Sequence, residues 1–310
     1  MGWGKLFSVI LIAVRTHAAI FGSDTRAAVT PASPANQYGR SVAIAVLSAL
    51  WSESAPGQID LATDTNRLCT SERFAQAPAL AYSCTGFLVG PDLIATAGHC
   101  MINVGEDHNE TQTYCQVYSW LFDYQTSDSG TTPVKGIAED KLYHCKQVIY
   151  AIREEHAPYR DYALVQLDRS VQGRTPFALS DQPLASNISL SMIGFPLGAP
   201  ETLSSDGHVL LNDSSRQSFI TNLSALEGNS GSPVFDPHGQ VVGILIGGTP
   251  SQSDFSDPSA GCEHLNVCSL DGSTCALPDT QIFDGFQRTG SEVQRIQPLL
   301  DLLKSLVPGA

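Results

Sequence analysis

The chain has 310 residues, of which 42% are apolar and 15% charged, so it is long enough to build one large domain or two packed ones around a real core. Its formal net charge of -14 argues against nucleic acids and anionic membranes as partners, because both would repel so acidic a surface at long range. We therefore expect neither nucleic-acid binding nor membrane binding by the mature protein.

The first residues have the features of a secretory signal peptide. Lys5 supplies a positive start, LFSVILIAV (6–14) is apolar apart from Ser8, and THAA (16–19) offers small residues for cleavage. An uncleaved anchor is the alternative, but so short an apolar run cannot cross a bilayer as a helix. We predict that residues 1–19 are the signal peptide, cut after Ala18 or Ala19, and that the protein is secreted.

Most of the remaining chain is predicted to form strands. Short runs rich in branched and aromatic residues alternate with turn-forming Gly, Pro, Asn and Asp, which indicates a mostly antiparallel β protein of the barrel or sandwich kind. These runs include SVAIAVLSALW, CTGFLVG, LIATA, QVYSWLF, QVIYAI, YALVQL, SLSMIGF, SFITNL and QVVGILIGG.

Two stretches and the C-terminus differ from this pattern. Residues 55–78 and 249–284 show no periodicity and are predicted to be long surface loops. From Ser291, a predicted N-cap, apolar residues recur at helical spacing and predict a C-terminal helix over about 291–306, with Pro298 distorting its middle.

The cysteines form an even set of eight, and a secreted chain favours disulfides over metal ligation. We expect no metal or other cofactor. Four N-x-S/T sequons begin at Asn109, Asn187, Asn212 and Asn222, where a glycan would require an exposed site.

The stretch LEGNSGSPVFD (226–236) carries the first candidate chemistry. Gly228 and Gly231 let the backbone bend tightly around Ser230, so that the N–H groups of Gly228 and Ser230 could point together at one oxyanion. A serine hydroxyl in such a loop also needs a neighbouring base and a carboxylate that orients the base. Taken alone, an isolated G-x-S-G is far more often a β-turn with an ordinary hydroxyl.

The longer string GNSGSPVF, followed by GQVVGILIGG, resembles the nucleophile segment of the chymotrypsin-like serine endopeptidases, especially the branch that includes the glutamyl endopeptidases. On that resemblance Ser230 is the nucleophile. TAGHC, within CTGFLVGPDLIATAGHC (84–100), resembles the family's histidine motif and makes His99 the base. RDYALVQLDR (160–169) fits the family's aspartate at the start of an apolar strand and makes Asp161 the residue that orients His99.

The resemblance covers about two thirds of the chain, from SVAIAVL to ILIGG, and implies an all-β fold with two packed antiparallel β-barrels of the chymotrypsin type and a C-terminal helix. The implied endopeptidase domain is 20–310, with the first barrel over about 40–168 and the second over about 175–290. It also implies a disulfide between Cys84 and Cys100 beside His99. A bridge between Cys115 and Cys145 is expected in addition, which leaves Cys69, Cys262, Cys268 and Cys275 for two more.

By resemblance, the pocket for the residue before the scissile bond is formed by Ser224, Ala225, Glu227, Leu245, Ile246, Gly247 and Gly248. Ser224 stands where trypsin has an aspartate, and neither Ala225 nor Leu245 can hold a substrate carboxylate. These residues favour an apolar or small side chain, while Glu227 at the rim makes a basic one the second choice. Gly247 and Gly248 would let a substrate strand pair with the enzyme's edge.

Trypsin-like zymogens pair a new N-terminal amine with an aspartate beside the nucleophile. Here Asn229 occupies that position and carries no charge, so we predict that activity does not depend on such an ion pair. The expected partners are protein or peptide substrates, and the expected state is a monomer.

Three functions remain to be compared. The first is a secreted serine endopeptidase that works through an acyl-enzyme, and the second is a catalytically idle, protease-like binding protein. The third is an esterase of the α/β-hydrolase type. It is disfavoured because the order His, Asp, Ser along this chain differs from the order of the triad in that fold, and because no G-x-S-x-G elbow is present.

Overall fold

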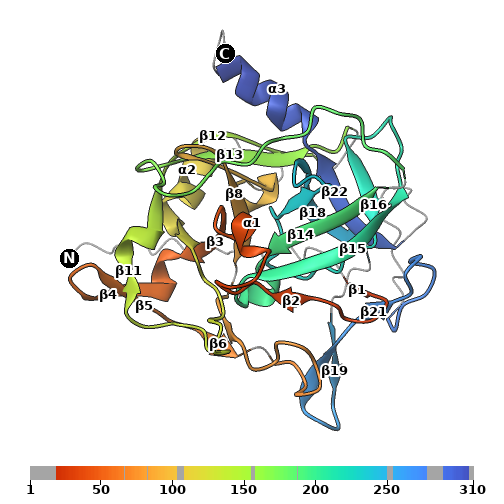
Figure 1. Ribbon diagram of the computed structural model, residues 1–310, viewed down its shortest axis with the longest axis horizontal. Coiled ribbons are helices and arrows are strands. Elements are labelled where there is room, and N and C mark those ends of the chain that lie inside the picture. Colours follow the sequence, from red (N-terminus) through yellow and green to blue (C-terminus); the bar gives the residue numbers. More distant parts are fainter. Residues whose placement is uncertain are drawn as a thin grey trace, which may run out of the picture.

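The computed structural model describes residues 19–65, 67–81, 83–102, 108–154, 158–186, 188–249, 254–277 and 289–306. Two closed antiparallel barrels of six strands each lie side by side in it (Figure 1). This confirms the predicted fold class. Among the described residues, no helix is long and apolar enough to span a bilayer.

The first barrel has the strand order β10-β12-β13-β9-β8-β3 and closes through pairing of β10 with β3. Its strands are β3 (Val42–Leu47), β8 (Cys84–Gly90), β9 (Leu93–Thr96), β10 (Tyr118–Phe122), β12 (Leu142–Arg153) and β13 (Asp161–Leu167).

The second barrel has the order β14-β17-β18-β22-β16-β15 and closes through pairing of β14 with β15, to which β2 (Ala27–Ala28) adds an outer strand. Its strands are β14 (Ser189–Gly194), β15 (Thr202–Leu211), β16 (Ser218–Thr221), β17 (Pro233–Phe235), β18 (Val241–Thr249) and β22 (Gly290–Arg295).

Smaller elements surround the barrels. The short sheets pair β1 (Ile20–Phe21) with β21 (Val267–Cys268), β5 (Gln58–Leu61) with both β4 (Trp51–Ala55) and β11 (Ile137–Ala138), β6 (Asp64–Thr65) with β7 (Pro78–Ala79), and β19 (Asp254–Asp257) with β20 (Cys262–Leu265). The helices are α1 (Asn36–Gly39), α2 (His108–Val117) and α3 (Gln297–Leu306), and single 3₁₀ turns are η1 (Ser48–Leu50), η2 (Gly98–Cys100), η3 (Glu139–Lys141) and η4 (Pro196–Gly198).

Strand β3 shows how the sequence builds two cores at once. Side chains alternate between the faces of a strand, and in VAIAVL the alanines at 43 and 45 alternate with branched residues. Ala43 and Ala45 lie in the core of the first barrel, where small side chains leave room for the buried Trp120. Val42 and Ile44 face the other way, into a cluster that also contains Phe235 and other second-barrel residues. One strand therefore helps to fill a barrel and to bind the two barrels together.

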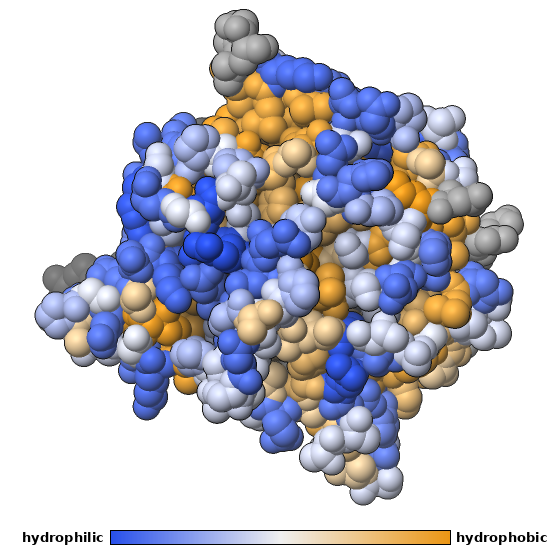
Figure 2. Space-filling model, viewed as in Figure 1, coloured by the Kyte–Doolittle hydropathy of each residue, from blue (hydrophilic) through white to orange (hydrophobic). Residues whose placement is uncertain are grey.

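The C-terminal helix begins at Gln297, not at Ser291 as the sequence predicted. Gly290–Arg295 is instead a strand of the second barrel that pairs with both β16 and β18, and the Ser291 hydroxyl donates to the carbonyl of Leu223 at 2.7 Å. Pro298 lies in the first helical turn, where a missing N–H costs little, so it does not distort the middle. Figure 2 shows an apolar area on the surface next to this helix, on a face where apolar and hydrophilic areas are mixed.

All eight cysteines are paired. The bridges Cys84–Cys100 and Cys115–Cys145 are present as predicted. The other four form Cys69–Cys262 and Cys268–Cys275. The stretches predicted as loops contain short strands, and Cys69–Cys262 joins the two stretches to each other.

Candidate active site

The pairing of β9 with β13 brings His99 and Asp161 together. Thr96 at the end of β9 lies opposite Ala163 near the start of β13, so η2 with His99 and the first residue of β13 meet at the same edge of the first barrel. His99 Nδ1 lies 2.8 Å from one Asp161 carboxylate oxygen, and the His99 backbone N–H donates to the other at 2.8 Å. Asp161 therefore fixes both the ring and the backbone of His99.

Gly98 makes this approach possible. A Cβ at position 98 would overlap the carbonyl oxygen of Ile152 and lie 2.9 Å from an Asp161 carboxylate oxygen. Any residue larger than glycine would therefore push η2 away from Ile152 on β12 and from Asp161 on β13.

A residue of the second barrel, Gln294, holds Asp161 in place. The Asp161 backbone N–H donates to the side-chain oxygen of Gln294 at 2.9 Å, and the Gln294 amide donates to the carbonyl of Gln217 at 2.8 Å. Gln294 is fully buried on β22, so the carboxylate is anchored across the junction of the two barrels.

The segment 228–231 forms a tight loop from the second barrel. Gly228 and Gly231 both have positive φ, of 88° and 89°, a conformation that glycine adopts without strain. The N–H groups of Gly228 and Ser230 make no hydrogen bond to any described residue, although both residues are buried. Two buried donors without a partner, two residues apart in one turn, form the arrangement that an oxyanion requires.

Thr85 connects this loop to the first barrel. Its hydroxyl donates to the carbonyl of Gly228 at 2.8 Å, and its N–H donates to the carbonyl of Ser230 at 2.7 Å. Thr96, three residues before His99, donates its own hydroxyl to the Thr85 carbonyl at 2.7 Å. The elements that carry His99 and Ser230 are thus fixed to the same residue.

His99 Nε2 is buried and has no hydrogen-bond partner among the described residues, so the Ser230 hydroxyl does not yet bond to it. Proton transfer requires this contact, which in ligand-free sites is often long and tightens when substrate binds. Sulfur atoms of Cys84 and Cys100 lie within 4.8 Å of a His99 nitrogen, but they are joined in a disulfide and offer no thiolate to a metal.

The residues predicted for the specificity pocket separate into two groups. Glu227, Ile246, Gly247 and Gly248 are partly exposed. Ala225 and Leu245 are almost fully buried, and both pack into the core of the second barrel. The structure thus brings the first group, and not Ala225 or Leu245, to the surface beside the loop of Ser230.

Ser224 is covered by the start of the described chain. Its hydroxyl accepts the N–H of Phe21 at 3.0 Å, and the next residue, Ala225, donates its N–H to the carbonyl of Ala19 at 3.1 Å. No local pattern of residues indicates this contact. A signal-peptide cut after Ala18 would preserve the bond from Ala225, whereas a cut after Ala19 would remove it; residues 1–18 of the predicted signal peptide lie outside the described residues.

Two barrels that meet at a histidine–carboxylate pair and a glycine-rich serine loop define a peptidase of the chymotrypsin-like class. A family model described as "Trypsin-like peptidase domain" matches residues 84–244, more than half of the chain. The chain therefore belongs to the trypsin-like peptidase family.

Solved structures with similar folds include a Glu endopeptidase in complex with MPD, at 17% identity and a TM-score of 0.48, over 74% of this chain and 88% of that one. The Rv3671c protease in its inactive form matches at 15% identity and a TM-score of 0.44, over 91% of this chain and 98% of that one. The active form of the Rv3671c protease from M. tuberculosis matches at 15% identity and a TM-score of 0.40, over 74% of this chain and 83% of that one. The glutamyl branch is thus a distant match. A comparison with curated proteins gives no match.

Proposed function

We propose that the protein is a secreted serine endopeptidase in which Ser230 is the nucleophile, His99 the general base and Asp161 the residue that orients His99. The observation that carries this proposal is the pair of hydrogen bonds that Asp161 accepts from the ring and the backbone of His99, at the same junction as the loop that presents Ser230. The leader sequence and the four disulfides among the described residues favour an exported protein.

The proposed reaction has two halves. The Ser230 oxygen attacks the carbonyl carbon of the scissile peptide while its proton passes to His99 Nε2, and the oxyanion is held by the N–H groups of Gly228 and Ser230. The C–N bond then breaks, and His99 gives the proton to the leaving amine. In the second half, His99 takes a proton from water as the water oxygen attacks the ester carbonyl of the acyl-enzyme; the ester bond to the Ser230 oxygen then breaks, and His99 returns the proton to Ser230.

Substrate would bind along β18. Strand β17 pairs with β18 only as far as Ile244, so on this side the segment 246–248 has no strand partner among the described residues. An extended peptide would add to this edge through backbone hydrogen bonds, as in β-augmentation. We propose an apolar or small residue before the scissile bond, because Ser224 is already bonded to Phe21 and no carboxylate lies at its position.

The test is cleavage of a diverse peptide mixture by the exported protein and by two serine variants. Ser230→Ala should abolish cleavage. Ser232→Ala is the matched control, because the Ser232 hydroxyl is buried in the same loop without a hydrogen-bond partner among the described residues. Equal cutting by wild type and Ser230→Ala would refute the assignment, and a folded wild type that binds peptides without cutting them would favour the binding protein instead.

A further inference from the structure

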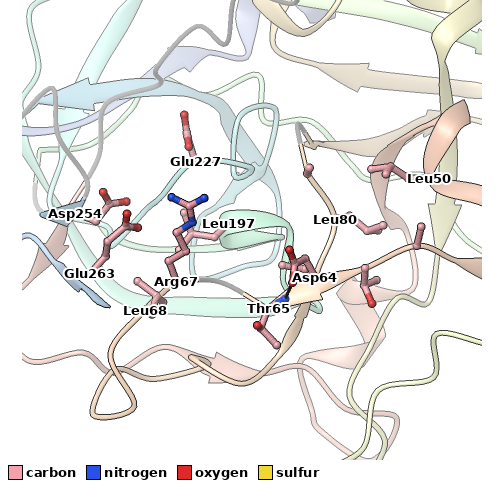
Figure 3. A pocket seen from close by; sticks show the side chains of 14 residues that line it. Leu50, Asp64, Thr65, Arg67, Leu68, Leu80, Leu197, Glu227, Asp254 and Glu263 are labelled. Carbon is pink, nitrogen blue, oxygen red and sulfur yellow. Dashed lines mark hydrogen bonds between the residues drawn. The ribbon is translucent and has the colours of Figure 1, made fainter. Parts of the chain in front are cut away.

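A pocket of about 470 Å³ lies beside the loop of Ser230 and is not used by the catalytic residues described above (Figure 3). Leu50, Leu80 and Leu197 contribute its apolar surface. Its volume lies within the range that can enclose one or two amino-acid side chains together with backbone.

The pocket lies on the leaving-group side of the site. Glu227, which precedes the oxyanion donor Gly228, forms part of its wall, and the Glu227 carbonyl accepts the N–H of Leu197, another wall residue. The residues on the acyl side, Ser224 and those of β18, do not line it. A peptide that pairs with β18 and passes Ser230 would therefore reach this pocket with the residues that follow the scissile bond.

Acidic side chains dominate the charged part of the lining. Among the described residues that line the pocket, the carboxylates Asp64, Glu227, Asp254 and Glu263 outnumber the one cationic side chain, Arg67, and Glu227 and Asp254 make further interactions of their own. Figure 3 shows Glu227, Arg67, Asp254 and Glu263 at one end of the pocket, apart from Leu50 and Leu80. Arg67 is exposed and forms no ion pair with any described residue, so it is not tied to these carboxylates. The excess of negative charge would attract a cation and repel an anion.

The charged wall of the pocket, formed by Arg67, Asp254 and Glu263, is held by backbone hydrogen bonds and a disulfide. The Glu263 N–H donates to the carbonyl of Arg67, and the Cys69 N–H donates to the carbonyl of Glu263, both at 2.9 Å. The disulfide Cys69–Cys262 lies next to these bonds and fixes the loop of Arg67 to the β19–β20 hairpin. Both segments lie outside residues 84–244, which the family model matches.

We propose that this pocket selects a lysine or arginine at one of the two positions that follow the scissile bond. The inference rests on the proposed endopeptidase function and adds a substrate class to it: polypeptides with an apolar or small residue before the bond and a basic residue just after it. The alkyl stem of the basic side chain would pack on the leucines while its charged end faces the carboxylates.

The experiment measures kcat/KM for peptides that share one acyl side and carry Lys, Gln or Glu at each of the first two positions after the bond. Lys should exceed Gln by about 5-fold, the effect of one partly screened ion pair, and the ratio should fall as salt rises. Equal rates for Lys and Gln would overturn the proposal. A preference for Glu would also overturn it and would assign recognition to Arg67.

Variants separate the pocket from the acidity of the whole molecule. Glu263→Gln and Asp254→Asn should each lower the Lys-to-Gln ratio about 2-fold or more, and Arg67→Gln should raise it. Asp140→Asn is the matched control, because it removes the same charge from an exposed site outside the pocket. If the Lys-to-Gln ratio falls equally in Asp140→Asn and Glu263→Gln, the preference for lysine arises from the net charge of the protein, and the proposal that the pocket selects it is refuted.

Failure of this inference is distinguishable from failure of the proposed function. Cleavage that depends on Ser230 but ignores the residues after the bond would refute the pocket alone. Absence of Ser230-dependent cleavage from all peptides would refute the endopeptidase itself. Thermal unfolding of every variant, compared with wild type, shows that a changed ratio does not arise from loss of the fold.

Discussion

Asp161 binds His99 at two points, with one carboxylate oxygen on the ring nitrogen Nδ1 and the other on the backbone N–H, each at 2.8 Å. The first contact selects the tautomer that leaves Nε2 free to accept a proton, and the second fixes the turn that carries the ring. The carboxylate side chain is only 14% exposed, so water competes little for either bond.

The first prediction follows from this pair. Asp161→Asn replaces an acceptor at one of the two points by an amide donor, which favours the wrong tautomer of His99. We expect kcat/KM for peptide cleavage to fall by about 10³- to 10⁴-fold with little change in KM. Steady-state kinetics on one peptide substrate measures this, and unchanged thermal unfolding excludes a folding defect. A decrease below 10-fold would show that Asp161 does not orient the base.

The second prediction concerns Glu201, which follows η4 and is fully buried. Burial raises the pKa of Glu201 from 4.5 to about 8, although Gln125 donates a hydrogen bond to its carboxyl at 2.6 Å. The unfolded chain releases this proton near pH 4.5 and the folded protein only near pH 8. Between these values the folded state holds the extra proton, so Glu201 lowers the free energy of unfolding as pH rises, by up to about 1.4 kcal/mol per pH unit.

Glu201→Gln removes this titration and should unfold at higher denaturant concentration than wild type, with a gap that widens from pH 5 to pH 8. Denaturant melts at several pH values measure it. Glu53→Gln, at an exposed position, controls for the loss of one carboxylate. A gap that does not vary with pH would mean that Glu201 is not protonated in the folded protein at neutral pH.

The third prediction compares two glycines. Gly98→Ala would place a Cβ on the carbonyl oxygen of Ile152, so we expect a loss of about 3 kcal/mol or more in the free energy of unfolding and loss of activity. Gly247→Ala meets no atom within 4 Å and should change stability by less than about 0.5 kcal/mol. Denaturant unfolding of both variants tests the contrast. A loss for Gly98→Ala as small as that for Gly247→Ala would show that the approach of η2 to β12 and β13 is looser than the structure has it.

The fourth prediction ranks two disulfides by the loops that they close. Cys69–Cys262 spans a sequence separation of 193 residues and Cys268–Cys275 only 7. From loop entropy, replacing the first pair by serines should cost about 5 kcal/mol and replacing the second about 2 kcal/mol. Thermal or denaturant unfolding of the two double variants gives the order. The reverse order would mean that the hairpin and the Arg67 loop stay together in the unfolded chain.

Local patterns predicted the strands and the site because each signal lies within a few residues. GNSGSPVF, TAGHC and RDYAL each contain the glycine, cysteine or apolar run that gives the reactive residue its setting. The contacts that support them could not be predicted in this way. Thr85 and Gln294 act through residues more than 100 positions away, and neither belongs to a pattern that distinguishes it from other strand residues.

Long-range packing decides two further features. The spacing of Val293, Ile296 and Leu299 is helical by count, yet it runs across a strand, a bend and a helix, because barrel closure outweighs local propensity. A glycan on the Asn222 sequon requires an exposed site, but the Asn222 side chain donates to the carbonyl of Leu270 and accepts the N–H of His208. Asn222 is 8% exposed and has no room for a sugar. The sequon at Asn187 lies outside the described residues.

The disulfide Cys69–Cys262 has a mechanical consequence. It links a loop from the half of the chain that builds the first barrel to a hairpin from the half that builds the second. These two segments cannot separate without breaking a covalent bond, so any relative movement of the two halves of the chain must pivot near this bridge. A reducing environment would remove the pivot.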